Sequence, residues 1–233
     1  MRKVGTIIDN LRSGEKAPDR HENPYLTEAL QLSEYLLTQA ELQKVFPNIF
    51  KDMQKPIVVE VGCYMGKNVI ELAQGNNNMN FLGIDITYKR VVKSARKLKR
   101  FDINNGKIAI CDARYLMNDL LPDQFLDGIC VFFPDPWPKD RHEKNRLLNQ
   151  QFIQVVYQKL KPNGFFWFKS DHLVYFTQTN DLLLKSGFVA DDFDNNQPRP
   201  QPENIIGGPY ETAFQKLFIN KGIPFYQRVY LKI

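Results

Sequence analysis

The sequence predicts an α/β fold whose doubly wound sheet is mostly parallel, with an antiparallel strand at the carboxyl terminus. From Pro56 onward, short apolar runs alternate with longer segments of helical pattern, which is typical of such sheets. The first run is β-branched and shows no polar alternation, as expected for a strand buried on both faces. Residues 1–25 are polar, with five basic side chains among turn formers, so we expect a flexible basic arm there; no internal repeat is found, and we expect a single domain over 26–233.

The first predicted elements lie between residues 26 and 75. Leucines at helical spacing predict one or two helices over 26–46. Residues 57–61 read Ile-Val-Val-Glu-Val and predict the first strand. A helix is expected to follow Gly66 and to stop near Gly75.

Two strand–helix pairs and a fourth strand follow. The apolar runs at 81–86 and 107–111 each predict a strand, and the basic segment 88–100 between them predicts a helix. A short helix is expected after Asp112, and residues 128–133 predict the fourth strand.

The last third contains a change of texture. We expect a helix over 144–160 that is ended by Pro162 and Gly164. Four prolines among Asn and Gln predict a long loop over 194–209. The remaining expected elements are a strand at 165–169, a helix that ends near Gly187, a short helix around 212–220 and a final strand at 224–231.

The composition narrows the class of protein. The net charge of +5 permits an acidic partner. No run of about 18 apolar residues is present, and no secretory signal is recognisable, so we expect a cytoplasmic protein without membrane contact. Cys63, Cys111 and Cys130 lack the spacing of disulfide or zinc sites, which predicts buried thiols and no metal.

Acidic residues lie at the ends of the first four predicted strands: Glu60, Asp85, Asp112 and Asp135. In doubly wound sheets the ligand lies at the carboxyl ends of the strands. Asp85 follows Gly62 at a spacing that suits ribose hydroxyls, and Asp112 is placed to accept from an adenine amino group. The alternative interpretation is that such acids only cap helices.

The glycine turn helps to separate classes of cofactor. Gly62 and Gly66 would let the backbone approach a ligand, but they do not form the Gly-x-Gly-x-x-Gly pattern of dinucleotide-binding proteins. A diphosphate would require positive groups or helix N–H groups, whereas four carboxylates suit a cationic cofactor. The sulfonium of S-adenosylmethionine meets that requirement.

The most specific motif covers residues 132–142, Phe-Phe-Pro-Asp-Pro-Trp-Pro-Lys-Asp-Arg-His. Two prolines flank Asp135, where they fix the backbone and remove N–H donors. The stretch resembles the signature of the tRNA (guanine-N7)-methyltransferase family, in which Phe-Pro-Asp-Pro-Trp precedes basic residues. The resemblance covers roughly 56–232 and includes Val59–Gly62, Gly83–Asp85, Cys111–Ala113, and Ser170 with Asp171.

The resemblance implies a Rossmann-like methyltransferase that moves a methyl group from S-adenosylmethionine to N7 of a guanine in tRNA. It implies a monomer or homodimer without an obligatory protein partner. The family also carries a Thr-x-x-Glu motif that binds substrate; Thr212 matches its threonine, but Gln215 replaces its acid. The implied cofactor contacts are Glu60, Gly62, Asp85, Asp112 and Asp135, and the implied substrate contacts are Lys139, Arg141, Asp171, Thr212 and Gln215.

This chemistry makes modest demands on the residues. Guanine N7 has a free lone pair, so alignment replaces general base catalysis. We expect Asp135 to grip the base and to stabilise the positive charge that develops on the purine. Asp171 would accept from the Watson–Crick edge of guanine, and Lys139 and Arg141 would contact phosphates.

The helix expected at 88–100 is a candidate RNA surface, since acids are absent from it. Phosphate contact and an ordinary solvated face both remain open. The residues that share its basic face are Lys89, Lys93, Arg96, Lys97 and Arg100.

Two departures from the family pattern leave alternatives. Tyr64 stands where the family loop has a glycine, and Gln215 lacks the charge of the substrate motif. The alternatives are a methyltransferase for another RNA or a small molecule, and an RNA-binding protein that has lost cofactor binding at Tyr64. The glycine pattern and the acidic crevice oppose a nicotinamide oxidoreductase.

Overall fold

The computed structural model describes residues 24–137, 145–190 and 210–233. The described residues form a mixed sheet of eight strands, in the order β1-β4-β3-β2-β5-β6-β8-β7. The strands are β1 (Leu36–Thr38), β2 (Ile57–Val61), β3 (Asn80–Asp85), β4 (Gly106–Ile110), β5 (Leu126–Phe132), β6 (Leu160–Ser170), β7 (Phe188–Ala190) and β8 (Tyr226–Lys232).

The described helices alternate with these strands along the chain. They are α2 (Pro24–Leu30), α3 (Gln39–Val45), α4 (Lys67–Gly75), α5 (Tyr88–Arg100), α6 (Ala113–Tyr115) with the π-helix Leu116–Leu120, α7 (Gln150–Lys159), α8 (Leu173–Lys185) and α9 (Ala213–Lys221). The chain divides into two compact units, Met1–Pro56 with Glu60–Leu116 and Ile57–Val59 with Met117–Ile233.

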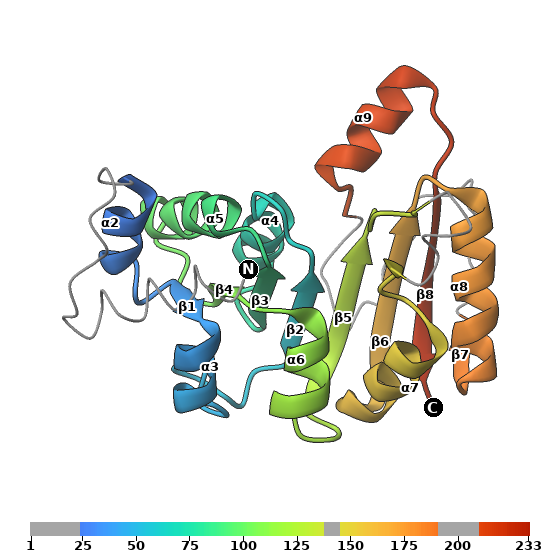
Figure 1. Cartoon of the computed structure of the whole chain (residues 1–233), viewed down its shortest axis with the longest axis horizontal. Helices are drawn as coiled ribbons and strands as arrows, with labels where there is room; N and C mark the ends of the chain where they lie inside the picture. Colours follow the sequence, from blue (N-terminus) through green and yellow to red (C-terminus); the bar gives the residue numbers. More distant parts are fainter. Residues whose placement is uncertain (1–23, 138–144, 191–209) are drawn as a thin grey trace. The chain divides into compact units, whose positions relative to one another are not determined.

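In the first unit, β4 pairs in parallel with both β1 and β3. Helices α4 and α5 lie on one side of these strands and α3 lies on the other (Figure 1). Helix α5 packs through Val91, Val92, Ala95 and Leu98, all fully buried. This stripe leaves the basic side chains of α5 at the surface, as its helical spacing predicts.

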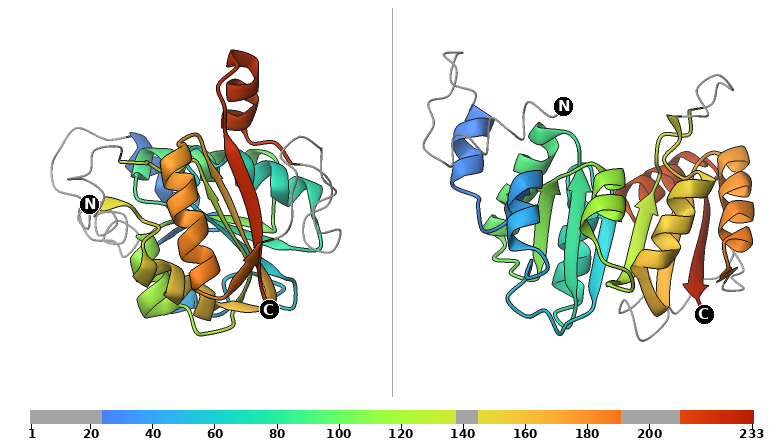
Figure 2. Two further views of the ribbon diagram at one scale, coloured as in Figure 1. Left: turned by 90° about the vertical axis from the view of Figure 1, so that its right-hand side faces the viewer. Right: turned by 60° about the horizontal axis from the view of Figure 1, so that its bottom comes forward.

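In the second unit, β5 and β6 are parallel, while β8 runs antiparallel to both β6 and β7. Helix α8 runs alongside β6 and β8, and α9 lies beyond the carboxyl ends of β5 and β6 (Figures 1 and 2). Aromatic residues dominate the core: Phe168 of β6 stacks on Phe176 of α8, with ring centroids 5.5 Å apart. The predicted antiparallel carboxyl-terminal strand is confirmed.

Several element predictions are confirmed, three are wrong in part, and one strand was missed. Helix α5 has the predicted bounds. Leu36 and Leu37 form a short strand, not a helix, because Thr38 starts α3 with a capping box to Glu41. Helix α7 begins only after its cap residue Asn149, β6 extends back to Leu160, and β7 was not predicted.

The structure also bears on the predictions for the cysteines, the membrane, metals, the proline-rich loop and the basic arm, the last two of which it describes only in part or not at all. The three cysteines are buried and free. Among the described residues, none of the helices has the length and hydropathy of a membrane span, and no cluster of His, Cys, Asp and Glu could hold a metal. The predicted loop at 194–209 lies outside the described residues, as do residues 1–23 of the predicted arm; Pro24 and Tyr25 belong to α2.

Candidate functional site

In the first unit, the loop after β2 turns through three residues with positive φ: Gly62 (78°), Tyr64 (50°) and Gly66 (66°). The N–H groups of Gly62 and Cys63 both donate to the carbonyl of Ile84 in β3, at 2.9 and 3.0 Å. This fixes the loop at the carboxyl ends of two strands, where the doubly wound fold places its ligand.

The two glycines of this loop serve different purposes. A Cβ at Gly66 would lie 2.5 Å from Cβ of Ser94, so this glycine allows close packing of the loop against α5. A Cβ at Gly62 would meet nothing within 4 Å. The backbone at Gly62 therefore borders open space, which fits the predicted approach of a ligand.

Tyr64 retains the left-handed backbone that glycine adopts easily. Its N–H donates to Oδ2 of Asp85 at 3.1 Å, which holds the strained residue in place. Tyr64 is 46% exposed, and the guanidinium of Arg90 lies 4.5 Å from the centroid of its ring. The side chain therefore lies against Arg90 of α5, and Tyr64 itself adopts the left-handed backbone at this position of the loop.

Asp85 is nearly buried at the end of β3. Its Oδ1 accepts from the N–H of Thr87 at 2.7 Å, and its Oδ2 lies 3.7 Å from Nη1 of Arg90. Asp85 thus connects the glycine loop to the start of α5. Each oxygen of a carboxylate can accept a further bond, so its predicted ribose contact stays a prediction compatible with this geometry.

Glu60 and Asp112 differ in exposure. Glu60 is buried in β2, and its Oε1 accepts from Nδ2 of Asn68 at 2.6 Å. Asp112 is exposed and caps α6 by accepting from the N–H of Arg114 at 2.7 Å, so the capping interpretation holds for this acid. The cofactor contacts predicted for both residues stay predictions.

The pKa of the buried Cys63 thiol is affected by the charged groups around this loop. Burial raises its pKa well above the ordinary value, and the nearby charges of Glu60 and Asp85 raise it further. Both carboxylates therefore lie close enough to Cys63 to disfavour its thiolate, while Arg90 acts in the opposite direction. Burial likewise raises the pKa of Cys111 to about 12, with Asp112 as a smaller cause.

In the second unit, the motif loop follows β5. Phe133 and Trp137 both adopt positive φ, 52° and 44°, on either side of Pro134–Pro136. The N–H of Phe133 donates to the carbonyl of Lys169 at 2.8 Å, and its ring packs on those of Phe214, Phe218 and Phe225. Asp135, between the two prolines, is exposed.

Asp171 follows β6 and is also exposed. Phe132 pairs with Lys169 in the parallel ladder of β5 and β6, so Asp135 and Asp171 belong to the same edge of the sheet. Their predicted roles toward guanine stay predictions. Lys139 and Arg141 lie outside the described residues, so nothing is added to their predicted phosphate contacts.

Thr212 and Gln215 are buried. Oγ1 of Thr212 caps α9 by accepting from the N–H of Gln215 at 3.1 Å. Oε1 of Gln215 accepts from Nζ of Lys169 at 2.6 Å, and Lys169 also donates to the carbonyl of Tyr210 at 3.2 Å. In this structure the motif supports α9 and a buried lysine, and its predicted substrate contact stays a prediction.

Sequence reasoning missed Lys169 and Arg146. Lys169 is fully buried at the end of an aromatic strand, 4.4 Å from the Trp167 ring centroid. A charged lysine that follows Phe-Phe-Trp-Phe in a buried strand needs a hydrogen-bonding partner, because burial of an unpaired charge is costly. The sequence of the strand could therefore have marked Lys169. Arg146 is also buried, but its partners are main-chain carbonyls of the motif loop and two side chains of α8, and no local pattern in the sequence marks such contacts.

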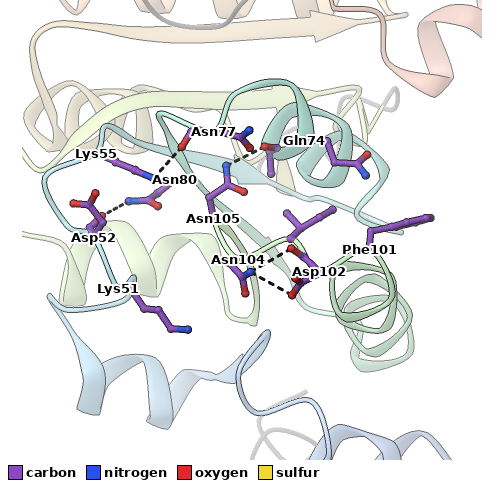
Figure 3. A pocket seen from close by; sticks show the side chains of 12 residues that line it. Lys51, Asp52, Lys55, Gln74, Asn77, Asn80, Phe101, Asp102, Asn104 and Asn105 are labelled. Atoms are coloured by element: carbon purple, nitrogen blue, oxygen red, sulfur yellow. Dashed lines mark hydrogen bonds between the residues drawn. The ribbon is translucent and has the colours of Figure 1, made fainter.

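A polar depression of about 540 Å³ lies at the amino ends of β3 and β4, next to Asn80 and Asn105 (Figure 3). Its polar groups hold the fold itself: Nδ2 of Asn80 donates to the carbonyl of Asp52 at 2.7 Å. Nδ2 of Asn105 donates to three main-chain carbonyls, those of Ala73, Asn76 and Met79. We assign no ligand to it.

Comparison with known proteins identifies the family. A family model described as "Putative methyltransferase" matches residues 54–226. The curated tRNA (guanine-N(7)-)-methyltransferase of Syntrophotalea carbinolica is 31% identical over 189 residues, which cover 81% of this chain and 77% of that protein. The chain belongs to the tRNA (guanine-N7)-methyltransferase family. The enzymes of the same name from Francisella philomiragia (31% identity, 81% of this chain, 79% of that protein) and Francisella tularensis subsp. novicida (33%, 86% and 85%) agree.

Solved structures confirm the predicted Rossmann-like methyltransferase fold. The aminoglycoside resistance methyltransferase NpmB1 is similar with a TM-score of 0.54 and 14% identity, over 84% of this chain and 94% of that chain. The precorrin-6y C5,15-methyltransferase of Geobacter metallireducens GS-15 is similar with a TM-score of 0.53 and 16% identity, over 76% and 80%. At these identities the similarity concerns the fold alone.

Proposed function

We propose that this protein transfers a methyl group from S-adenosylmethionine to N7 of a guanine in tRNA. The observation that carries the proposal is the Phe-Pro-Asp-Pro-Trp loop, in which Asp135 is exposed. The residues at the two ends of this loop, Phe133 and Trp137, adopt a left-handed backbone. Membership of the tRNA (guanine-N7)-methyltransferase family supports the same reaction.

The residues of the first unit fit the cofactor. Open space over Gly62 would admit a ligand close to the backbone, and Glu60 and Asp85 make the surroundings negative. When bound, S-adenosylmethionine supplies an electrophilic methyl group on a cationic sulfonium. Asp85 would hold ribose hydroxyls, Asp112 the adenine amino group, and the negative potential would favour the cation.

In the second unit, Asp135 and Asp171 would hold the guanine. Both carboxylates are exposed and accept hydrogen bonds only, so they suit the N–H donors of the Watson–Crick edge. Because N7 needs no deprotonation, orientation of the base is the main catalytic demand. The charge of Asp135 would also stabilise the purine as it becomes cationic.

Helix α5 would contact tRNA phosphates, although part of its charge serves the fold. Arg96 forms an ion pair with Glu28 of α2, and Nζ of Lys97 donates to the carbonyl of Met65 at 3.1 Å. Lys89 and Lys93 place their ammonium groups 5.8 and 5.7 Å from the ring centroid of Tyr25. Arg100 is exposed, so Lys89, Lys93 and Arg100 are the candidates for phosphate contact. A cytoplasmic monomer or homodimer, without an obligatory protein partner, remains our expectation.

Substitution of Asp135 tests the proposed role most sharply. The assay measures transfer of labelled methyl groups from S-adenosylmethionine to unmodified tRNA by the wild type, Asp135→Ala and Asp135→Asn. We expect both variants to bind tRNA and to lose roughly a hundredfold in kcat, as for other electrostatic groups. Asp123, an exposed acid whose partner is Lys159, supplies a control as Asp123→Asn. Normal transfer by Asp135→Ala would overturn the assignment.

A further inference from the structure

The motif loop is held in a conformation that its residues do not favour by themselves. Phe133 and Trp137 are bulky residues in the left-handed region, which L-residues other than glycine rarely adopt. Such strain persists only where the surrounding structure enforces it. Two contacts fix the amino end of the loop. The N–H of Phe133 donates to the carbonyl of Lys169, and the Phe133 ring packs on that of Phe218.

The carboxyl end of the loop is held by Arg146. Nε of its guanidinium donates to the carbonyl of Pro136 at 2.8 Å, and Nη2 lies 3.5 Å from the carbonyl of Trp137. These carbonyls belong to the two residues that follow Asp135. The planar guanidinium can reach both from one position, which a lysine ammonium on its flexible stem does not reproduce.

The other side of Arg146 is anchored on α8. Nη1 donates to Oε1 of Gln178 at 2.5 Å, and the guanidinium lies 5.1 Å from the ring centroid of Tyr175. Arg146 is only 7% exposed, so water competes little for these bonds. A buried cation thus connects a rigid helix to the backbone beside Asp135.

We propose that Arg146 is a positioning residue that fixes the Asp135 carboxylate by clamping the carbonyls of Pro136 and Trp137. Its kinetic consequence rests on the proposed function, whereas its effect on the loop does not. Arg146 therefore acts on the transition state through the orientation of Asp135 and not through substrate contact.

The test combines a loop probe with kinetics. The chain has two tryptophans, and Trp167→Phe leaves Trp137, in the loop, as the single tryptophan. Acrylamide quenching of Trp137 is measured in this background for Arg146, Arg146→Lys and Arg146→Met, and methyl transfer is measured for the same variants. Arg228 donates to Oδ1 of Asn180 on α8 at 2.8 Å, so Arg228→Met is a matched control away from the loop.

We expect Arg146→Met to raise the quenching constant about twofold and to lower kcat at least about tenfold, with KM for S-adenosylmethionine nearly unchanged. Arg146→Lys should fall between wild type and Arg146→Met, and it carries the comparison if Arg146→Met does not fold. Unchanged quenching in the Arg146 variants, or equal losses in Arg228→Met, would overturn the proposal. If the wild type transfers no methyl group, the proposed function fails, and quenching alone still decides whether Arg146 holds the loop.

Discussion

Substitution of the two glycines after β2 should separate packing from ligand access. In Gly66→Ala, the new Cβ would lie 2.5 Å from Cβ of Ser94, and φ of 66° would add left-handed strain. Overpacking costs about 1–3 kcal/mol and the strain about 1–2 kcal/mol, so the free energy of unfolding should fall by roughly 2–5 kcal/mol. Gly62→Ala has the same kind of φ, 78°, without a clash, and should cost only about 1–2 kcal/mol.

A double-mutant cycle isolates the clash. Ser94→Gly removes the Cβ and Oγ that the new methyl group of Gly66→Ala would meet, so it should restore about 1–3 kcal/mol to that variant, beyond its own cost in α5. Urea unfolding measures the four free energies, and calorimetry with S-adenosylmethionine measures binding. We expect Gly62→Ala to lose more affinity than stability. Equal destabilisation by the two alanine substitutions, or an additive cycle, would refute close packing of Gly66 against Ser94.

Three further predictions concern single groups. Asp85→Asn replaces an acceptor oxygen by an NH₂ group beside the N–H of Tyr64 or Thr87. The Kd for S-adenosylmethionine, measured by calorimetry, should therefore rise at least about tenfold. An unchanged Kd would contradict the role of Asp85. Folding raises the pKa of Cys111 from 9.0 to about 12, so the unfolded chain loses the thiol proton first as the pH rises. The free energy of unfolding therefore falls between pH 9.0 and about 12, and the loss is about 1.4 kcal/mol at pH 10. Cys111→Ala should flatten that decline in alkaline urea titrations, and an identical slope would be inconsistent with the shift. Lys89→Gln with Lys93→Gln should weaken tRNA binding and reduce the slope of log K against log salt by up to about 2; a similar change in the control Lys99→Gln, whose ammonium donates to the carbonyl of Gln31, would argue against a specific surface.

Local patterns predicted much of the first unit. Helix α5 was found with both ends because its apolar stripe of Val91, Ala95 and Leu98 repeats at helical spacing. The glycine turn and Asp85 were found because the fold places ligands at strand ends. Strand β1 has only three residues and depends on pairing with β4, so its leucines could not be distinguished from those of a helix.

The second unit was less predictable because its motifs depend on contacts distant in sequence. Asp135 was recognised from its flanking prolines, but its support by Arg146 comes from a side chain further along the chain and from α8. Gln215 was recognised as a missing acid, while its role as acceptor for Lys169 required the structure. Asp112 caps α6 and is exposed, so its capping role is observed while its predicted cofactor contact stays a prediction.

The most direct test is the identity of the nucleoside that the purified protein methylates. Unmodified tRNA transcripts are incubated with methyl-labelled S-adenosylmethionine and digested, and the labelled nucleoside is identified by mass spectrometry. We predict label in 7-methylguanosine, which would make Tyr64 and Gln215 tolerated variations of the family pattern. Label in another nucleoside, or tRNA binding without any label, would contradict methyl transfer to guanine N7.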